Sequence, residues 1–166
     1  MPRHPAVFLA GSWLSLTLPW CKTSPHVSSG ALPQSRDTAR AMSLENVEIV
    51  RRFLVIDDFD EALTYADPGI VWNPVEESSA QGHDAVRAST ARWKSEWDDY
   101  ELIPEEFADV GDRVVVTVRF RARGRGSGIE VGTRLYDVFT LRDGKIVRMD
   151  QFTEQSEAVE AAGLRD

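Results

Sequence analysis

The stretch 113-RVVVTVRFRARGRGSGIEVGTRLYDVFTLRDGKIVRMDQF-152 decides the fold. Apolar and polar residues alternate from Val114 onward, which is the period of a strand with one buried face. Gly124–Gly128 predicts a flexible hairpin loop, and Asp143-Gly144 predicts a two-residue hairpin turn. The stretch therefore predicts three strands joined as hairpins, over residues 114–123, 131–141 and 146–152.

The residues before this stretch predict mainly helices. Apolar residues recur at spacings of three and four, which predicts an amphipathic helix with Ser43 as its N-cap and an end near Ile56. Further patterns predict, in chain order, a helix over 60–65, a strand over 70–73, a helix from Asp84 and a strand over 100–107. Helices gathered before a run of hairpins indicate an α+β domain, with helices on one face of a curved sheet that encloses a pocket.

The first 41 residues differ from the rest in charge. They carry four basic residues and one acidic residue, whereas the remainder carries 15 basic and 26 acidic residues. Pro5–Cys21 has no charged residue and resembles a short signal-peptide core, although it is short for a membrane span. Three origins stay open: upstream sequence translated before a true start at Met42, an export signal, or a disordered tail. We expect an extension over 1–41, a domain over 42–166, and a cytoplasmic protein unless the extension exports it.

The composition excludes several classes of protein. A chain of 166 residues is the size of one domain. A net charge of −8 argues against a nucleic-acid partner. One cysteine and three dispersed histidines argue against a disulfide framework and a structural zinc site. No glycine-rich motif lies between a strand and a helix, so we expect no nucleotide cofactor. We also expect no metal and no membrane partner.

Five short motifs are spread over residues 42–164. They are MSLENVEIVRRF from Met42, Asp67-Pro68-x-x-Val71-Trp72, GHDAV from Gly82, LRDGKIVRM from Leu141 and EAVEAAGL from Glu157. Together they resemble the SnoaL-like group of the nuclear transport factor 2-like superfamily, which includes ketosteroid isomerases, polyketide cyclases, limonene epoxide hydrolase and scytalone dehydratase. The resemblance implies a cone-shaped α+β barrel that is often a homodimer through its sheet. It does not imply one reaction, because the superfamily includes enzymes and non-enzymatic binders.

Asp137 is the first candidate for chemistry. In the strand over 131–141, alternate residues from Val131 to Leu141 form the more apolar face, which places Asp137 inward between Leu135 and Phe139. Desolvation there would raise its pKa and make it a general acid or base near neutral pH. Two other interpretations stay open: a buried carboxyl satisfied by a backbone donor or an arginine, and an outward carboxyl if the register is shifted by one.

The last strand offers a second candidate position. Val147, Met149 and Gln151 share one face, and the other face holds Ile146, Arg148, Asp150 and Phe152. The charges predict that the second face is outward, so Gln151 points inward where several enzymes of the family have an acidic residue. Glutamine cannot act as a general base. If the faces are inverted, Asp150 is the inward acid.

Aromatic side chains are candidates for a ligand-binding wall, because they bury large areas. The candidates are Trp72, Trp93, Trp97 and Phe139, with Met149 beside them, and the alternative is that they are only core residues. Tyr65 and Tyr136 are candidate hydrogen-bond donors to a carbonyl oxygen. The stripe of Arg119, Arg121 and Arg123 indicates either an anion contact or an outer face paired across strands.

These residues support three functional hypotheses. The first is a cofactor-free isomerase or cyclase of a small hydrophobic carbonyl compound, in which Asp137 shuttles a proton and a tyrosine or Gln151 steadies the enolate oxygen. The second is a non-catalytic ligand-binding or dimeric interaction domain, which the missing second acid favours. The third is epoxide-hydrolase-like addition of water, which needs an acid–base network that Gln151 does not supply.

Overall fold

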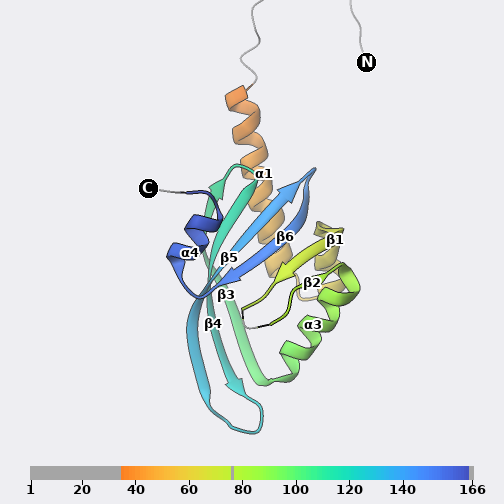
Figure 1. Ribbon diagram of the computed structural model, residues 1–166, viewed down its shortest axis with the longest axis vertical. Coiled ribbons are helices and arrows are strands. Elements are labelled where there is room, and N and C mark those ends of the chain that lie inside the picture. Colours follow the sequence, from red (N-terminus) through yellow and green to blue (C-terminus); the bar gives the residue numbers. More distant parts are fainter. Residues whose placement is uncertain (1–34, 76, 165–166) are drawn as a thin grey trace, which may run out of the picture. The chain divides into compact units, whose positions relative to one another are not determined.

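The computed structural model describes residues 35–75 and 77–164. Its elements are α1 (Ser35–Val55), α2 (Phe59–Ala62), the 3-10 helix η1 (Leu63–Tyr65), β1 (Ala66–Asn73), β2 (Ala80–Gln81), α3 (His83–Ser95), β3 (Trp97–Val110), β4 (Arg113–Gly124), β5 (Glu130–Arg142), β6 (Lys145–Phe152) and α4 (Gln155–Ala161) (Figure 1). Helices α1 to α3 precede the long hairpins, as the sequence predicts, and α4 follows them. The α+β fold class is therefore confirmed.

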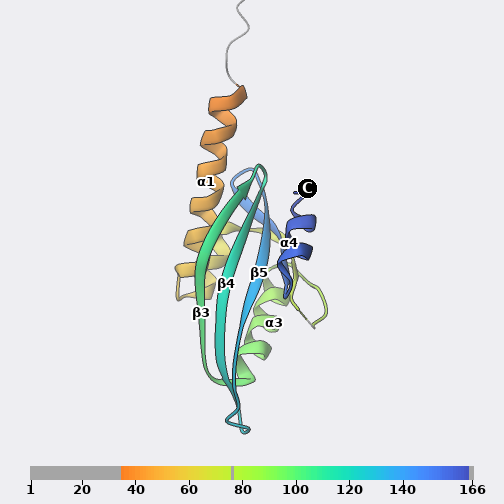
Figure 2. The same cartoon turned by 90° about the vertical axis from the view of Figure 1, so that its left-hand side faces the viewer.

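In the described part of the chain, the strands form one six-stranded sheet in the order β2-β1-β6-β5-β4-β3. All neighbours are antiparallel except β1 and β6, which run parallel. Figure 2 shows β3, β4 and β5 bending together, with α1 and α4 on opposite sides of them. We call the face toward α1 and α3 the inner face and the face toward α4 the outer face.

The strand β4 shows why the sheet has two different faces. Its alternate residues Val114, Val116, Val118, Phe120 and Ala122 are all buried in the main core cluster. This cluster also includes residues of α1, α3 and the neighbouring strands, so it defines the inner face. Val115 points the other way and packs with Ala158 and Ala162 near α4 in a smaller cluster. The alternation predicted for this strand is confirmed.

The hairpin turn between β5 and β6 also follows the prediction. Asp143 has a φ of 51° and Gly144 a φ of 72°. Two successive positive φ values are what a two-residue turn requires when its twist matches that of the flanking strands. Glycine adopts this conformation without strain, and aspartate tolerates it better than most residues. The Asp-Gly pair therefore fixes where β5 ends and β6 begins.

The first helix begins earlier than the sequence predicts. α1 starts at Ser35, so Ser43 lies inside the helix and is not its N-cap. The segment between them has no proline or glycine and contains alanine, arginine and methionine, which favour helix. The end at Val55 agrees with the predicted end near Ile56. Of the expected extension over 1–41, residues 1–34 lie outside the described residues.

The remaining elements differ from the prediction mainly at their ends. The strand expected over 70–73 begins at Ala66, and the loop expected before α3 contains the short strand β2. The backbone N–H of Gly82 donates to the carbonyl oxygen of Ile70 at 2.8 Å, which joins the start of α3 to β1. Gly82 has a φ of 80°, a value that favours glycine at this point.

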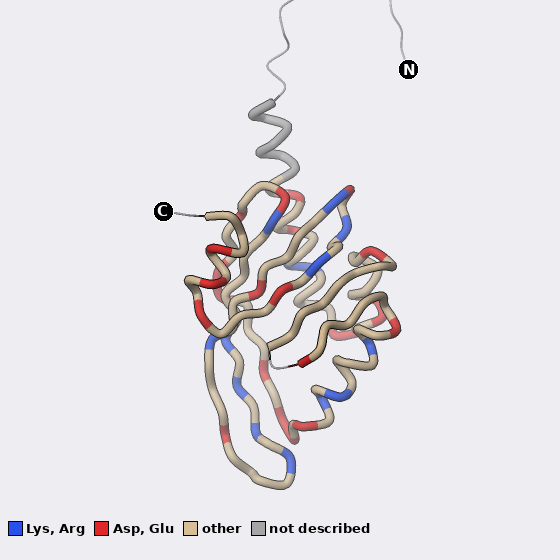
Figure 3. The backbone as a smooth tube through the Cα atoms, viewed as in Figure 1, with Lys and Arg blue, Asp and Glu red and all other residues tan. Residues whose placement is uncertain are grey.

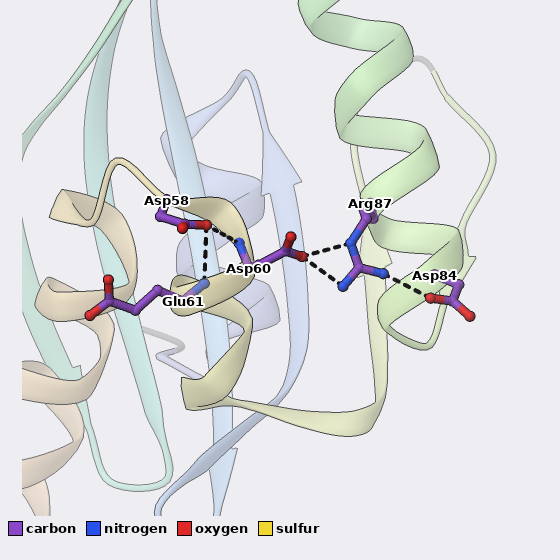
Figure 4. A network of polar contacts seen from close by, with 5 residues as sticks. All are labelled: Asp58, Asp60, Glu61, Asp84 and Arg87. Carbon is purple, nitrogen blue, oxygen red and sulfur yellow. Dashed lines mark hydrogen bonds and ion pairs between the residues drawn. The ribbon is translucent and has the colours of Figure 1, made fainter.

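Helix α2 is capped and joined to α3 by a polar network (Figure 4). Asp58 Oδ1 accepts hydrogen bonds from the backbone N–H groups of Asp60 at 2.9 Å and Glu61 at 3.4 Å. Arg87 of α3 donates to Asp60 from Nε and to Asp84 from Nη1, both at 2.7 Å. These side chains are exposed, so the ion pairs contribute little stability and mainly orient α3.

The outer face carries the arginine stripe, and Figure 3 shows basic residues spaced along β4. Arg119 and Arg134 both approach Glu105, at 3.3 and 3.1 Å. Arg123 approaches Asp99 at 3.6 Å. Arg119 and Arg123 of the stripe are therefore paired across strands, as one of the two interpretations of the sequence predicts.

The strand β3 lies at an edge of the sheet and is strongly acidic. Its register against β4 shifts between Pro104 and Glu106, where an extra residue bends the strand. Its acidic residues are Asp98, Asp99, Glu101, Glu105, Glu106 and Asp109.

Among the described helices, none combines the length and apolar character needed to cross a membrane.

Candidate functional site

Asp137 lies on the inner face near the middle of β5. Its neighbours across the sheet are Val116 on β4 and Gln151 on β6. Its relative exposure is 3%, and Leu135 and Phe139 flank it on the same face and are also buried. The predicted inward orientation of Asp137 is confirmed. A carboxyl in this position is enclosed by apolar groups on most sides.

Burial dominates the electrostatics of Asp137. It raises the pKa from 3.8 to about 7, because the charged form loses its hydration, and a hydrogen bond from Gln151 works in the opposite direction. Gln151 Nε2 donates to Asp137 Oδ1 at 3.1 Å. No ion pair to Asp137 is found within residues 43–75 and 77–164, so the partner is an amide and not an arginine. Such a carboxyl can both take and return a proton near neutral pH.

Gln151 connects Asp137 to the chain that follows β1. Its Oε1 accepts a hydrogen bond from the backbone N–H of Val75 at 3.4 Å. The amide is thus oriented with its oxygen toward Val75 and its nitrogen toward Asp137. Sequence analysis predicted the inward position of Gln151 but missed Val75, since a backbone donor in a loop has no recognisable sequence signal.

A bulge in β6 explains which side chains of this strand point inward. Leu141 pairs with Ile146 and Thr140 pairs with Arg148, so Val147 is an extra residue without a partner. As a result, Ile146 before the bulge and Met149 after it both join the inner core cluster. The prediction that Ile146 faces outward is wrong. The prediction that Met149 faces inward is confirmed.

Asp150 lies on the outer face, where it pairs with Val138. Arg148 Nε and Nη2 donate to its two carboxylate oxygens at 2.7 and 2.8 Å, and Asn73 Nδ2 donates to it at 2.6 Å. The inverted arrangement, with Asp150 as the inward acid, is therefore not what the structure shows. Among the described residues, no second carboxyl pairs with Asp137 across β5 and β6.

The aromatic candidates separate into two groups. Trp72 pairs with Met149 across β1 and β6, and Met149 pairs with Phe139. These three residues form a row beside the Asp137–Gln151 pair. Phe139 has a relative exposure of 0% and packs edge-on against Phe53 at 5.9 Å between ring centroids, so it is a core residue. Trp72 and Met149 are half-buried. The indole Nε1 of Trp72 is enclosed and has no hydrogen-bond partner among the described residues.

The second group lies at the start of β3. Trp93 and Trp97 pack against each other at 6.1 Å, and both contact Phe120, at 5.7 and 5.4 Å between centroids. Trp93 also contacts Tyr100 at 5.0 Å. Phe120 is four residues from Val116, the β4 neighbour of Asp137, which is about 13 Å along a strand. Trp93 and Trp97 therefore close one end of the inner core, away from Asp137.

The two tyrosines named by the sequence do not join Asp137 in a hydrogen-bond network. Tyr65, at the end of η1, interacts with Arg52, and hydrogen bonds to Glu48 and then to Tyr65 raise the pKa of that arginine. Tyr136 is on the outer face, where it packs with the α4 cluster. Tyr136 is therefore not a donor for a ligand on the inner face.

Two cavities in the described part of the chain lie away from Asp137. One has a volume of about 140 Å³ on the outer face and is lined mainly by β3, β4, Tyr136, Val159 and Leu164. The other is a wide groove of about 740 Å³ near Arg121 and Gly132. Asp137 and its neighbours Leu135 and Phe139 are themselves buried, so other side chains cover the carboxyl. In the same part of the chain, no three histidine, cysteine or acidic side chains gather closely enough to hold a metal ion.

The sequence of residues 50–149 matches the SnoaL-like domain. The chain belongs to the SnoaL-like family. This match covers β1 to β5 and most of β6, and therefore includes Trp72, Asp137 and Met149. No curated protein matches the chain.

Solved structures share the fold of this SnoaL-like protein. A protein of Jannaschia sp. CCS1, provisionally assigned as a SnoaL-like polyketide cyclase, is 25% identical, with a TM-score of 0.62 over 75% of this chain and 94% of that one. A nuclear transport factor 2-like protein of Burkholderia xenovorans LB400 is 23% identical, with a TM-score of 0.60 over 72% and 97%. A Catenulispora acidiphila protein with a ketosteroid isomerase-like fold, in complex with trimethylamine, is 13% identical, with a TM-score of 0.58 over 71% and 94%. The last two likenesses concern the fold alone.

Proposed function

We propose that this SnoaL-like protein is a cofactor-independent acid–base enzyme that isomerises or cyclises a small hydrophobic carbonyl compound. The observation that supports this best is Asp137, a carboxyl enclosed in the inner face with a pKa raised to about 7 by burial. A general acid or base works best when its pKa lies near the working pH. Membership of the SnoaL-like family agrees with this class of chemistry.

The proposed reaction needs one carboxyl. The ionised Asp137 takes a proton from the carbon next to the carbonyl, the C–H electron pair forms a C=C bond, and the carbonyl oxygen becomes an enolate oxygen. In an isomerisation, the protonated Asp137 then returns the proton to another carbon. In a cyclisation, the enolate carbon bonds to a second carbonyl carbon of the same molecule, the C=O electron pair moves onto that oxygen, and Asp137 returns its proton there. Gln151 Nε2 holds the carboxyl in place throughout. No redox partner is consumed in either outcome.

The surroundings of Asp137 select the substrate. Leu135, Phe139 and Met149 share the inner face with it, so an apolar molecule gains most by binding there. Because Asp137 is only 3% exposed, a substrate must displace half-buried side chains such as Met149 to reach the carboxyl. These side chains would then line the bound molecule.

Hydrogen–deuterium exchange at carbon tests the proposal without knowledge of the natural substrate. A panel of cyclic and aryl ketones is incubated with the protein in D₂O, and deuterium uptake next to the carbonyl is measured by mass spectrometry. We expect faster uptake for at least one ketone, with a rate that rises as the pH passes through about 7.

Two asparagine variants complete this experiment. Asp137→Asn keeps the size of the side chain but cannot take a proton, so it should abolish the uptake. Asp150→Asn is the matched control, because Asp150 pairs with Val138, the residue next to Asp137, and lies on the outer face. Unchanged uptake in the Asp137 variant would contradict the proposal.

The second candidate function is non-catalytic binding of a small apolar molecule. The burial of Asp137 favours it, and so does the lack of a second carboxyl paired with Asp137 among the described residues. Epoxide-hydrolase-like addition of water is weaker still, since Asp150 faces outward. Native mass spectrometry of the purified full chain would detect a retained molecule. A ligand that binds and is recovered unchanged would favour binding over turnover.

We also propose that the protein is a homodimer through the outer face of its sheet. This face presents alternating acidic and basic side chains, such as Glu101 opposite Arg121, which two copies can pair by a twofold rotation. The same native mass spectrum reports the number of copies. A monomer at micromolar concentration would contradict this.

A further inference from the structure

The indole of Trp72 holds a hydrogen-bond donor that no described residue accepts. Its Nε1 is enclosed by other atoms, and within residues 43–75 and 77–164 no acceptor lies within hydrogen-bonding distance. Indole nitrogen is a donor only, so a carbonyl, carboxylate or hydroxyl oxygen must satisfy it. Enclosed donors are almost always satisfied in native proteins, and each exception calls for an explanation. A ligand oxygen supplies one.

The sheet register places this donor beside the proposed catalytic carboxyl. Trp72 is opposite Met149, and Gln151 lies two residues further along the same strand and holds Asp137 on the next one. All four side chains lie on the inner face. The strands that carry Trp72 and Asp137 flank β6, so about 10 Å separates their backbones. The Trp72 and Asp137 side chains are therefore too far apart to contact each other directly. A cyclic molecule lying over Met149 is large enough to contact both.

We propose that Trp72 Nε1 donates a hydrogen bond to the oxygen of the carbonyl group next to which Asp137 removes a proton. This inference rests on the proposed function and specifies its substrate class: a ring compound with a carbonyl or enol oxygen on the side facing β1. When the C–H electron pair forms the C=C bond, negative charge moves onto that oxygen, and the Trp72 N–H stabilises it. A donor aimed at developing charge in a site without water lowers the barrier for this step.

A phenol probes this arrangement directly, because a phenolate oxygen has the charge and planar geometry of an enolate oxygen. 4-Nitrophenol is suitable, since its phenolate absorbs visible light and its binding to the full chain can be followed by absorbance. We expect saturable binding to the natural protein. Trp72→Phe keeps the apolar ring and removes only the donor, so it should weaken the binding about tenfold.

Trp97→Phe is the matched control. Trp97 Nε1 is also enclosed without a partner, but its ring packs against Trp93 and Phe120 at the far end of the inner core. This variant should bind the probe as the natural protein does. Urea unfolding should show that both variants remain folded, with similar losses of stability from the smaller ring, because both indoles pack against the core.

Three results would overturn the inference: no binding of 4-nitrophenol to the natural chain, equal affinity in Trp72→Phe, or an equal loss in Trp97→Phe. Failure of the proposed function is recognised separately, by the deuterium-uptake assay with Asp137→Asn. Binding that depends on Trp72 without any deuterium uptake would keep the inference and remove the enzyme. Deuterium uptake that depends on Asp137, together with normal probe binding by Trp72→Phe, would keep the proposed enzyme and remove the inference about Trp72.

Discussion

Replacing Asp137 by asparagine should remove a large pH dependence from the stability of the folded protein. The side chain has a relative exposure of 3%, and its pKa is raised from 3.8 to about 7. The folded state therefore holds this proton more tightly than the unfolded state. It follows that the contribution of Asp137 to stability is complete below the unfolded pKa and is lost as the pH rises through the folded value.

The size of the effect follows from the two pKa values. A rise from 3.8 to about 7 corresponds to about 4 kcal/mol over the whole titration, at about 1.4 kcal/mol per pKa unit. Between about pH 5.5 and pH 8, the natural protein should lose about 2 kcal/mol relative to Asp137→Asn. Glu77, whose pKa is lowered chiefly by its hydrogen bond from Arg92, has the opposite dependence, but it is the same in both proteins.

Urea unfolding followed by tryptophan fluorescence at these two pH values measures the difference. With a slope of about 2 kcal/mol per molar urea, the gap between the two midpoints should change by about 1 M. Asp150→Asn is the control and should behave as the natural protein does, because it leaves Asp137 in place. Curves that shift in parallel for natural protein and Asp137→Asn would refute the reasoning, since Asp137 would then ionise in the fold without cost.

Three further outcomes are expected. Gln151→Met removes the hydrogen bond that lowers the pKa of Asp137, so an NMR titration should place that pKa above about 7, and an unchanged or lower value would contradict this. Gly144→Ala should lower the free energy of unfolding in urea by about 1 kcal/mol, because the φ of Gly144 is 72°. Gly132→Ala should be nearly neutral, because its added Cβ approaches no atom closer than 3.8 Å. Equal costs would disprove the turn argument. Phe139→Ala should destabilise the fold by about 3–5 kcal/mol, and a thermal melt that moves by only a degree or two would show that the ring is not the packed core residue described here.

Much of the sheet could be predicted because its strands alternate over many residues. β4 gives five buried positions in strict alternation, and β5 places Asp137 inward by the same count. β6 is shorter and carries a bulge. Counting every second residue forward from the buried Ile146 would place Asp150 inward, whereas the extra Val147 restores Gln151 to the inner face. A bulge is a property of two paired strands, so one strand's pattern does not reveal it.

The site was less predictable than the fold for similar reasons. The inward orientation of Asp137 and Gln151 follows from local pattern, but the hydrogen bond between Gln151 and Val75 joins segments far apart in the chain. Tyr136 was a candidate donor because of its hydroxyl group. It is adjacent to Asp137 in the same strand, however, so the alternation already places it on the outer face. The space around Asp137 depends on how closely α1 and α3 approach the sheet, which no short sequence pattern specifies.

The acidic edge strand β3 has a consequence for how copies of this protein meet. An edge strand has unpaired backbone groups onto which another chain can add, and such addition is a common route to aggregates. Pro104 lacks one of these donors, the bend beside it distorts the rest, and repelling carboxylates on two approaching copies oppose strand addition. The other edge, β2, is only two residues long. The sheet is therefore expected to stop growing at six strands, which leaves its broad face for association between copies. A basic substitution near Pro104 would weaken the repulsion between edges, so we expect it to lower solubility during expression.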